Sequence, residues 1–115
     1  MSFKNRNEKI GNHSIEFISP VHEIDSFNGE ELKDYICNLE DVTAIVINFS
    51  DITYVNSRGL RELLQILKIL KERNILLYLT EVSSDINKIF IHTNLNRLFI
   101  ITGTDQEVID IIAKS

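Results

Sequence analysis

The chain has 115 residues, which fits a single domain, and its 43% hydrophobic and 25% charged residues are typical of globular proteins. A net charge of −5 argues against a nucleic-acid backbone as the main partner, and a single cysteine excludes an internal disulfide and a cysteine-rich zinc site. No apolar run approaches the roughly 20 residues of a membrane span, and residues 1–12 lack the apolar segment of a signal peptide. We therefore expect one cytoplasmic domain over residues 1–115, without a membrane span.

The N-terminal segment predicts one weak strand and one clear strand. Residues 3–10 are polar and only weakly strand-like, whereas residues 13–19 alternate, with Ile15 and Phe17 on one side. The only proline, Pro20, limits the second strand. We expect these strands to pair antiparallel at an edge of a sheet.

A helix and a buried strand follow. Residues 26–40 have helical spacing, and Glu30 and Glu31 are expected in the first turn, where the helix dipole favours acidic side chains. The apolar face of this helix would consist of Leu32, Tyr35, Ile36 and Leu39. Cys37 is expected on or beside that face as a small hydrophobe. Residues 42–49 form a continuous apolar run, which is typical of a strand buried on both faces.

The second half repeats the alternation of strand and helix. The expected elements are a helix over 57–72, a strand over 74–82, a helix over 83–94, a strand over 97–102 and a helix over 104–115. In the third helix a serine cap is followed by Asp85 in the first turn. This alternation predicts right-handed βαβ units, and therefore an α/β domain with a mixed sheet, a parallel core and about four α-helices.

The turn from Asn56 to Gly59 puts Ser57 on display where a strand gives way to a helix. Serine is a favoured N-cap, because its hydroxyl can accept hydrogen bonds from the first N–H groups of the helix. Alternatively, Ser57 is a phosphoacceptor, because a phosphate at a helix N-terminus meets free N–H groups and a favourable dipole. Both interpretations can hold at once. Gly59 would leave room for a partner's backbone to approach.

The helix over 57–72 has two faces. The leucines predicted to face the sheet are Leu60, Leu63, Leu64, Leu67 and Leu70. Ile69 falls about opposite this stripe, beside Arg58, Glu62 and Gln65. This outer face is either a partner surface that includes Ser57, or an ordinary surface with one isolated apolar residue.

The sequence offers few arrangements of residues that could support catalysis. The three histidines, His13, His22 and His92, share no metal-ligand spacing, and there is neither a phosphate-binding loop motif nor a dinucleotide-binding glycine motif. Glu23 and Asp25 are expected to lie in a solvated loop. We predict no catalytic residue, no metal and no cofactor, and a small enzyme or phosphocarrier is the least favoured class.

The stretch INFSDITYVNSRGLREL, residues 47–63, resembles the signature of STAS domains of the anti-sigma factor antagonist family, Asp-Leu-Ser-x-Val-x-x-Ile-Asp-Ser-x-Gly-Leu. Upstream, VHEID at 21–25 looks like the family's Gly-Glu-Leu-Asp segment. Downstream, residues 74–109 look like its strand, short helix, Thr-Gly-Leu-x-x-Leu-Phe turn and final helix. The resemblance covers roughly residues 12–113 and implies a STAS-like fold.

The resemblance implies a binding module rather than an enzyme. Antagonists of this family bind an anti-sigma factor that is also a serine kinase, and the kinase ends the interaction by phosphorylating the serine that matches Ser57. A PP2C-type phosphatase restores it. Asp25 matches an aspartate near the same surface. The expected partner-binding residues around Ser57 are then Asp25, Asn56, Arg58, Gly59, Glu62, Gln65 and Ile69.

Five positions depart from the family pattern. Asn48 and Asn56 stand where the family has aspartate, His22 and Asn94 where it has glycine, and Arg58 where it has a small residue. Asparagine keeps the shape of aspartate but not its charge, so a kinase that uses the carboxylate would phosphorylate the serine poorly. Arg58 would crowd the kinase, or pair with a phosphate once formed. The alternative function is therefore a STAS module that is not phosphorylated, as a scaffold of a sensory complex or an accessory subunit of a transport system.

Overall fold

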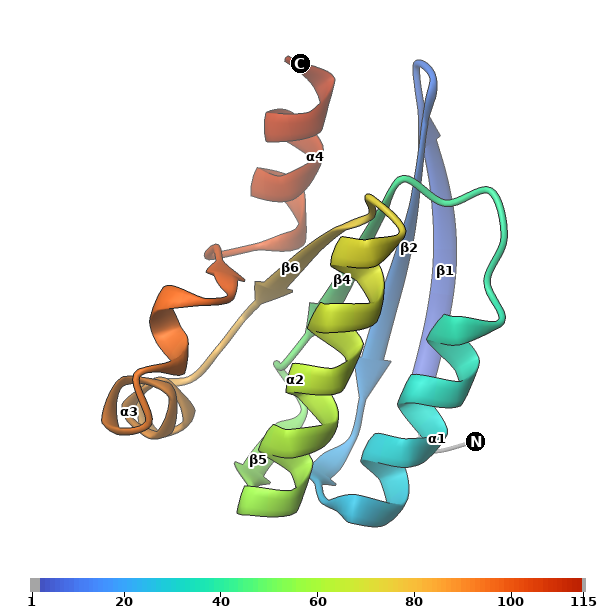
Figure 1. Cartoon of the computed structure of the whole chain (residues 1–115). Coiled ribbons are helices and arrows are strands. Elements are labelled where there is room, and N and C mark those ends of the chain that lie inside the picture. Colours follow the sequence, from blue (N-terminus) through green and yellow to red (C-terminus); the bar gives the residue numbers. More distant parts are fainter. Residues whose placement is uncertain (1–2, 115) are drawn as a thin grey trace.

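The computed structural model describes residues 3–114 and is built on a five-stranded sheet (Figure 1). From edge to edge the strands are β1 (Phe3–Ile10), β2 (His13–Pro20), β4 (Ala44–Asn48), β6 (Leu76–Thr80) and β7 (Ile100–Ile101). In this sheet β1 and β2 pair antiparallel, and the other neighbours pair parallel. The predicted α/β domain with a parallel core is confirmed, and so is the antiparallel pairing of the weakly patterned N-terminal strand.

The described part of the chain contains four α-helices, as predicted. They are α1 (Ser26–Cys37), α2 (Ser57–Glu72), α3 (Ser84–His92) and α4 (Asp105–Ala113), with a one-turn 3-10 helix, η1 (Leu95–Arg97), after α3. Figure 1 shows α1 and α2 side by side and running in the same direction, with their N-terminal ends at the same end of the molecule. Within residues 3–114, no helix has the length and apolar character that crossing a membrane would require.

The apolar side chains of the strands divide into two cores, one on each face of the sheet. Ile45 and Ile47 of β4 belong to the larger core, which the buried residues of α1, α2 and α3 complete. Ala44 and Val46 belong to the smaller core, in which Val108 of α4 is buried. Because all these β4 side chains are buried, the prediction of a strand covered on both faces is confirmed.

A second, two-stranded sheet lies where the helices begin. Its strands, β3 (His22–Ile24) and β5 (Ile52–Val55), pair in parallel and directly precede α1 and α2. The backbone N–H of Asn56 donates to the Ile24 carbonyl oxygen at 3.2 Å. A Cβ built on Gly59 would lie 2.0 Å from that same oxygen. The first turn of α2 is therefore packed directly against the backbone of β3, at a distance that only glycine allows.

One acidic side chain is buried at the centre of β2. Glu16 is 4% exposed and accepts hydrogen bonds from Tyr35 of α1 at 2.6 Å and from Asn7 and Asn5 of β1 at 3.1 and 3.2 Å. Burial, and then the hydrogen bond to Glu16, raise the pKa of Tyr35 to about 12. The tyrosine therefore keeps its proton at neutral pH and remains a donor. This network ties α1 to the antiparallel edge of the sheet.

Helix α1 begins at the predicted residue, but it ends earlier than predicted and its first turn differs. Asp25 and Asn28 form a reciprocal capping box, so the helix begins at Ser26 and the predicted acidic pair, Glu30 and Glu31, falls beyond its first turn. Cys37, the last residue of the helix, was expected on or beside the apolar face and is exposed.

Two of the departures from the family pattern lie in left-handed backbone. His22 has a φ of 70° and Asn94 a φ of 60°. Glycine adopts this conformation without steric cost and asparagine tolerates it, whereas histidine does so less readily. The family's glycines at these positions thus have a conformational reason, and this chain meets the same geometry at some strain.

Substituting Gly59 should destabilise the fold far more than substituting a glycine that is special only in its backbone. We expect Gly59→Ala to lower the free energy of unfolding by at least about 3 kcal/mol, because the new methyl group overlaps the Ile24 carbonyl. Gly11→Ala is the matched control: Gly11 has a φ of 59° and no atom within 4 Å of a built Cβ, so its loss should be about 1 kcal/mol. Urea unfolding measures both. Equal losses would contradict the packing described here.

Candidate functional site

The turn between β5 and α2 is capped by Asn56 rather than by Ser57. Asn56 has extended backbone (φ −89°, ψ 176°), and its side-chain oxygen accepts from the Gly59 N–H at 2.8 Å. A cap residue must precede the first helical residue, and Ser57 is already helical. The interpretation of Ser57 as the cap is therefore wrong. Its hydroxyl is exposed in the first turn of α2, and Arg58 beside it is exposed as well.

Asp25 lies at the same end of the molecule and caps the neighbouring helix. One of its carboxylate oxygens accepts from the N–H groups of Phe27 at 2.9 Å and Asn28 at 3.0 Å, and Asn28 returns a bond to the Asp25 N–H at 2.7 Å. Since Ile24 pairs with Val55 in the small sheet, the residues that follow them, Asp25 and Asn56, cap two adjacent helices. The structure thus brings Asp25, Asn56, Ser57 and Arg58 to one end of the fold.

Two exposed aromatic residues at this end were missed by the sequence analysis. Phe27, in the first turn of α1, is 79% exposed, and Tyr54, paired with Glu23 in the small sheet, is 52% exposed. The available signal was that Phe27 falls outside the apolar stripe of its helix. Large exposed rings beside an exposed serine are typical of a surface that contacts another protein.

Gly59 does not serve the role expected from the sequence. It is buried, and the space left by its missing side chain is filled by Ile24 of the same chain. Gly59 therefore lets α2 approach β3, and offers no contact surface to a partner.

The supposed outer face of α2 lies against α1. Lys33 Nζ of α1 is 2.9 Å from the Glu62 carboxylate and donates to Gln65 at 2.6 Å, and the hydrogen bond to Glu62 raises the pKa of Lys33. Ile69 is half-buried in a groove of about 470 Å³ between the two helices. Gln65 is exposed as expected, whereas Glu62 and Ile69 are half-buried beside α1, because helical spacing gives angles around the helix but does not say where the neighbouring helix packs.

The sheet-facing stripe of α2 is correspondingly rotated. Its buried side chains include Ile66, which the sequence analysis had left out, whereas Leu64 is only half-buried.

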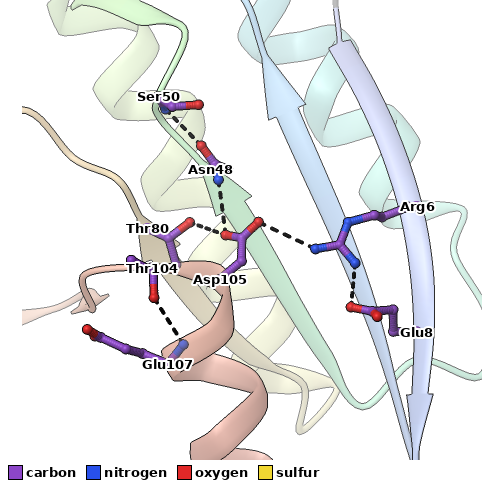
Figure 2. Close-up of polar contacts among 8 residues, drawn as sticks. All are labelled: Arg6, Glu8, Asn48, Ser50, Thr80, Thr104, Asp105 and Glu107. Carbon is purple, nitrogen blue, oxygen red and sulfur yellow. Dashed lines mark hydrogen bonds and ion pairs between the residues drawn. The ribbon is translucent and has the colours of Figure 1, made fainter.

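Asn48, the first departure from the family pattern, lies on the opposite face of the sheet. Figure 2 shows its amide donating to Asp105 of α4, at 3.1 Å, while its oxygen accepts from the Ser50 N–H at 2.8 Å. Thr80 also donates to Asp105, at 2.5 Å, and the Arg6 guanidinium is 3.7 Å from the same carboxylate. An aspartate at position 48 would face this carboxylate. The amide thus has a structural reason, and the sheet separates it from Ser57.

The capping role assigned to Asn56, and not to Ser57, can be tested by measuring the stability of variants at each position. Asn56→Ala should lower the free energy of unfolding by about 1 kcal/mol, because the Gly59 N–H loses its acceptor. Ser57→Ala should change it by less than about 0.5 kcal/mol, as for an ordinary exposed residue. Urea unfolding of both variants measures the difference. A larger loss of unfolding free energy for Ser57→Ala than for Asn56→Ala would show that the serine, not the asparagine, caps the helix.

The partnership of Asn48 with Asp105 predicts a charge-dependent loss. At pH 7, Asn48→Asp should cost about 2 kcal/mol, because a donor to a carboxylate becomes a second carboxylate. In the folded variant the new carboxyl takes up a proton at higher pH than in the unfolded chain, so the deficit should narrow as the pH falls from 7 to 4.

The exchanged pair Asn48→Asp with Asp105→Asn is the control, and it should recover at least half of the loss at pH 7. If the loss of stability changed neither with pH nor in the exchanged pair, repulsion between the two carboxylates would not be its cause.

Comparison with known proteins agrees with the fold described above. Residues 7–111 match the family model described as the STAS domain. The fold is similar to the Bacillus cell fate determinant SpoIIAA in its phosphorylated form, with a TM-score of 0.68, 21% identity and coverage of 95% of this chain and 99% of that chain. It is also similar to an anti-sigma factor antagonist from Mycobacterium paratuberculosis, with a TM-score of 0.71, 20% identity and coverage of 96% and 93%.

A third similar structure, a sulfate transporter family protein from Wolinella succinogenes, has a TM-score of 0.75, 12% identity and coverage of 88% of each chain. At these identities the structural likeness shows the fold alone. The family match spans most of the sequence, and the chain therefore belongs to the STAS domain family.

Proposed function

We propose that this domain is an anti-sigma factor antagonist in a partner-switching pathway of the cytoplasm. It binds an anti-sigma factor that is a serine kinase, and phosphorylation of Ser57 ends the interaction until a PP2C-type phosphatase reverses it. One observation carries the proposal: the hydroxyl of Ser57 is exposed in the first turn of α2 while Asn56 performs the capping. Modifying the serine therefore removes no bond that holds the helix.

The electrostatics of the turn suit a switch. A phosphate adds a charge of about −1.5 to −2, and the positive end of the helix dipole and the exposed Arg58 beside it would stabilise that charge. The same charge would repel an acidic partner surface. The fold itself need not change, so the effect would be confined to the interface.

The partner surface proposed here centres on Ser57 and Arg58, with Asp25 and Asn56 at their caps and Phe27 as an exposed apolar anchor. Of the other residues expected from the sequence, Ile69 could be reached only along the groove between α1 and α2. Gln65 is exposed but accepts a hydrogen bond from Lys33, which also engages Glu62. SpoIIAA, similar in fold, is described in a phosphorylated form, and the Mycobacterium protein is described as an anti-sigma factor antagonist.

The second candidate is a STAS module that is not phosphorylated, in a sensory complex or a transport system. Asn56 in place of the family's aspartate, and the long Arg58 beside the serine, favour it. So does the similarity in fold to the sulfate transporter family protein. Asn48 no longer contributes, since its side chain serves the α4 face of the sheet.

Intact-mass spectrometry of the protein from its own cells, with phosphatases inhibited, separates the two candidates. We expect a population heavier by one phosphate that disappears in Ser57→Ala and persists in Ser50→Ala, since Ser50 is a second exposed serine of the same segment. When binding to the anti-sigma factor kinase is measured, the Ser57→Glu variant should bind at least about 10-fold more weakly than the Ser57→Ala variant. If no phosphate appears under any growth condition, the scaffold function is favoured instead.

A further inference from the structure

The solvent face of α1 carries an apolar side chain followed by acidic ones. Phe27, Glu30, Glu31 and Asp34 line one shallow depression, and their spacing of i, i+3, i+4 and i+7 makes them a single stripe. Glu31 and Asp34 also border a depression with Phe3 of β1, on the side of the helix away from α2. We call this stripe the acidic flank.

A groove of opposite character runs along the far side of α2. It encloses about 340 Å³ and is lined by Leu64, Leu67 and Leu98, the last of which is 47% exposed after η1. Lys68 and Lys71 form its rim. We call this the leucine groove. Glu72 closes one end, and Arg61 lies one turn before Leu64 on the same stripe.

The flank and the groove cannot meet within one molecule. In Figure 1, α1 borders one side of the helical layer, α2 occupies the middle, and the segment of α3 and η1 lies on the other side. Lys33 of α1 contacts Glu62 and Gln65 on one side of α2, whereas Leu64 and Leu67 line the groove with Leu98 on the other. Lys68 borders the depressions on both sides. The acidic flank can therefore reach a leucine groove only on another copy.

The two stripes match in register. Phe27 is followed by acidic residues at i+4 and i+7, and Leu64 is followed by lysines at the same two intervals. Because α1 and α2 run in the same direction, a second copy whose helices run parallel to those of the first would bring its α1 parallel to α2 of the first. Phe27 would then enter the leucine groove near Leu64, with the acidic residues beside Lys68 and Lys71.

We propose that this domain self-associates head to tail, with the acidic flank of one copy in the leucine groove of the next. The occupant is a second copy of this chain, because the chain itself carries the complementary stripe at the matching spacing. Each contact leaves one groove and one flank free, so association continues beyond the dimer into open chains or a closed ring. The proposal does not depend on phosphorylation of Ser57, which lies outside both stripes, but the acidic flank shares Phe27 with the proposed partner surface.

Analytical ultracentrifugation with charge reversal tests it. The average mass of the wild type should rise steadily between about 10 μM and about 1 mM protein. A groove variant, Lys68→Glu with Lys71→Glu, and a flank variant, Glu30→Lys with Asp34→Lys, should each keep the mass of one chain. Their equimolar mixture should associate again, because the intact groove meets an intact flank and the reversed groove meets a reversed flank of opposite charge.

The matched control is Lys4→Glu with Lys114→Glu, which changes the charge as much as the groove variant but at exposed positions outside both stripes, and it should associate like the wild type. Both interface variants remain net negative, so general attraction cannot explain a complex in their mixture. A wild type of single-chain mass at about 1 mM, a mixture that does not pair, or a control that loses association would each overturn the proposal.

Discussion

The carbonyl oxygen of Ile24 is the point on which the arrangement of the site depends. It accepts from the Asn56 N–H, and its closeness to Gly59 excludes any side chain there. This contact sets how closely the first turn of α2 approaches β3. It thereby fixes the start of α2 beside the start of α1, and the position of Ser57 follows. Strands as short as β3 and β5 are marginal on their own, so the two-stranded sheet also depends on the burial of Ile24, Ile52 and Val55 in the larger core.

Two carboxylates, one on each face of the sheet, bind elements together by accepting hydrogen bonds. Glu16 receives donors from β1 and α1, and Asp105 receives them from β4 and β6, with Arg6 of β1 nearby. Burying a carboxylate is costly unless several donors compensate it, and both sites provide them. Arg6 also lies over the ring of Phe17, 4.0 Å from its centroid, so the edge strand is attached to the α4 face as well.

Apolar periodicity was enough to predict the four α-helices of the described residues and a sheet with a parallel core, because those segments bury long stripes. The bounds of α2, Ser57–Glu72, agree with the predicted helix. The small sheet was not found, because three or four residues are too few to show a period. The cap could not be assigned either, since asparagine and serine are both favoured and the choice depends on the backbone angles of Asn56. The environment of Glu62 was missed because it depends on where α1 packs.

A turn held this firmly on β3 has a consequence for how quickly the domain could be recognised. Asn56 is bonded through both its backbone and its side chain, and Gly59 has no space to move toward Ile24. A partner would therefore meet a preformed surface and would not wait for a loop to order itself. Association would be limited by diffusion and orientation, and discrimination between states of the domain would fall mainly on the lifetime of the complex.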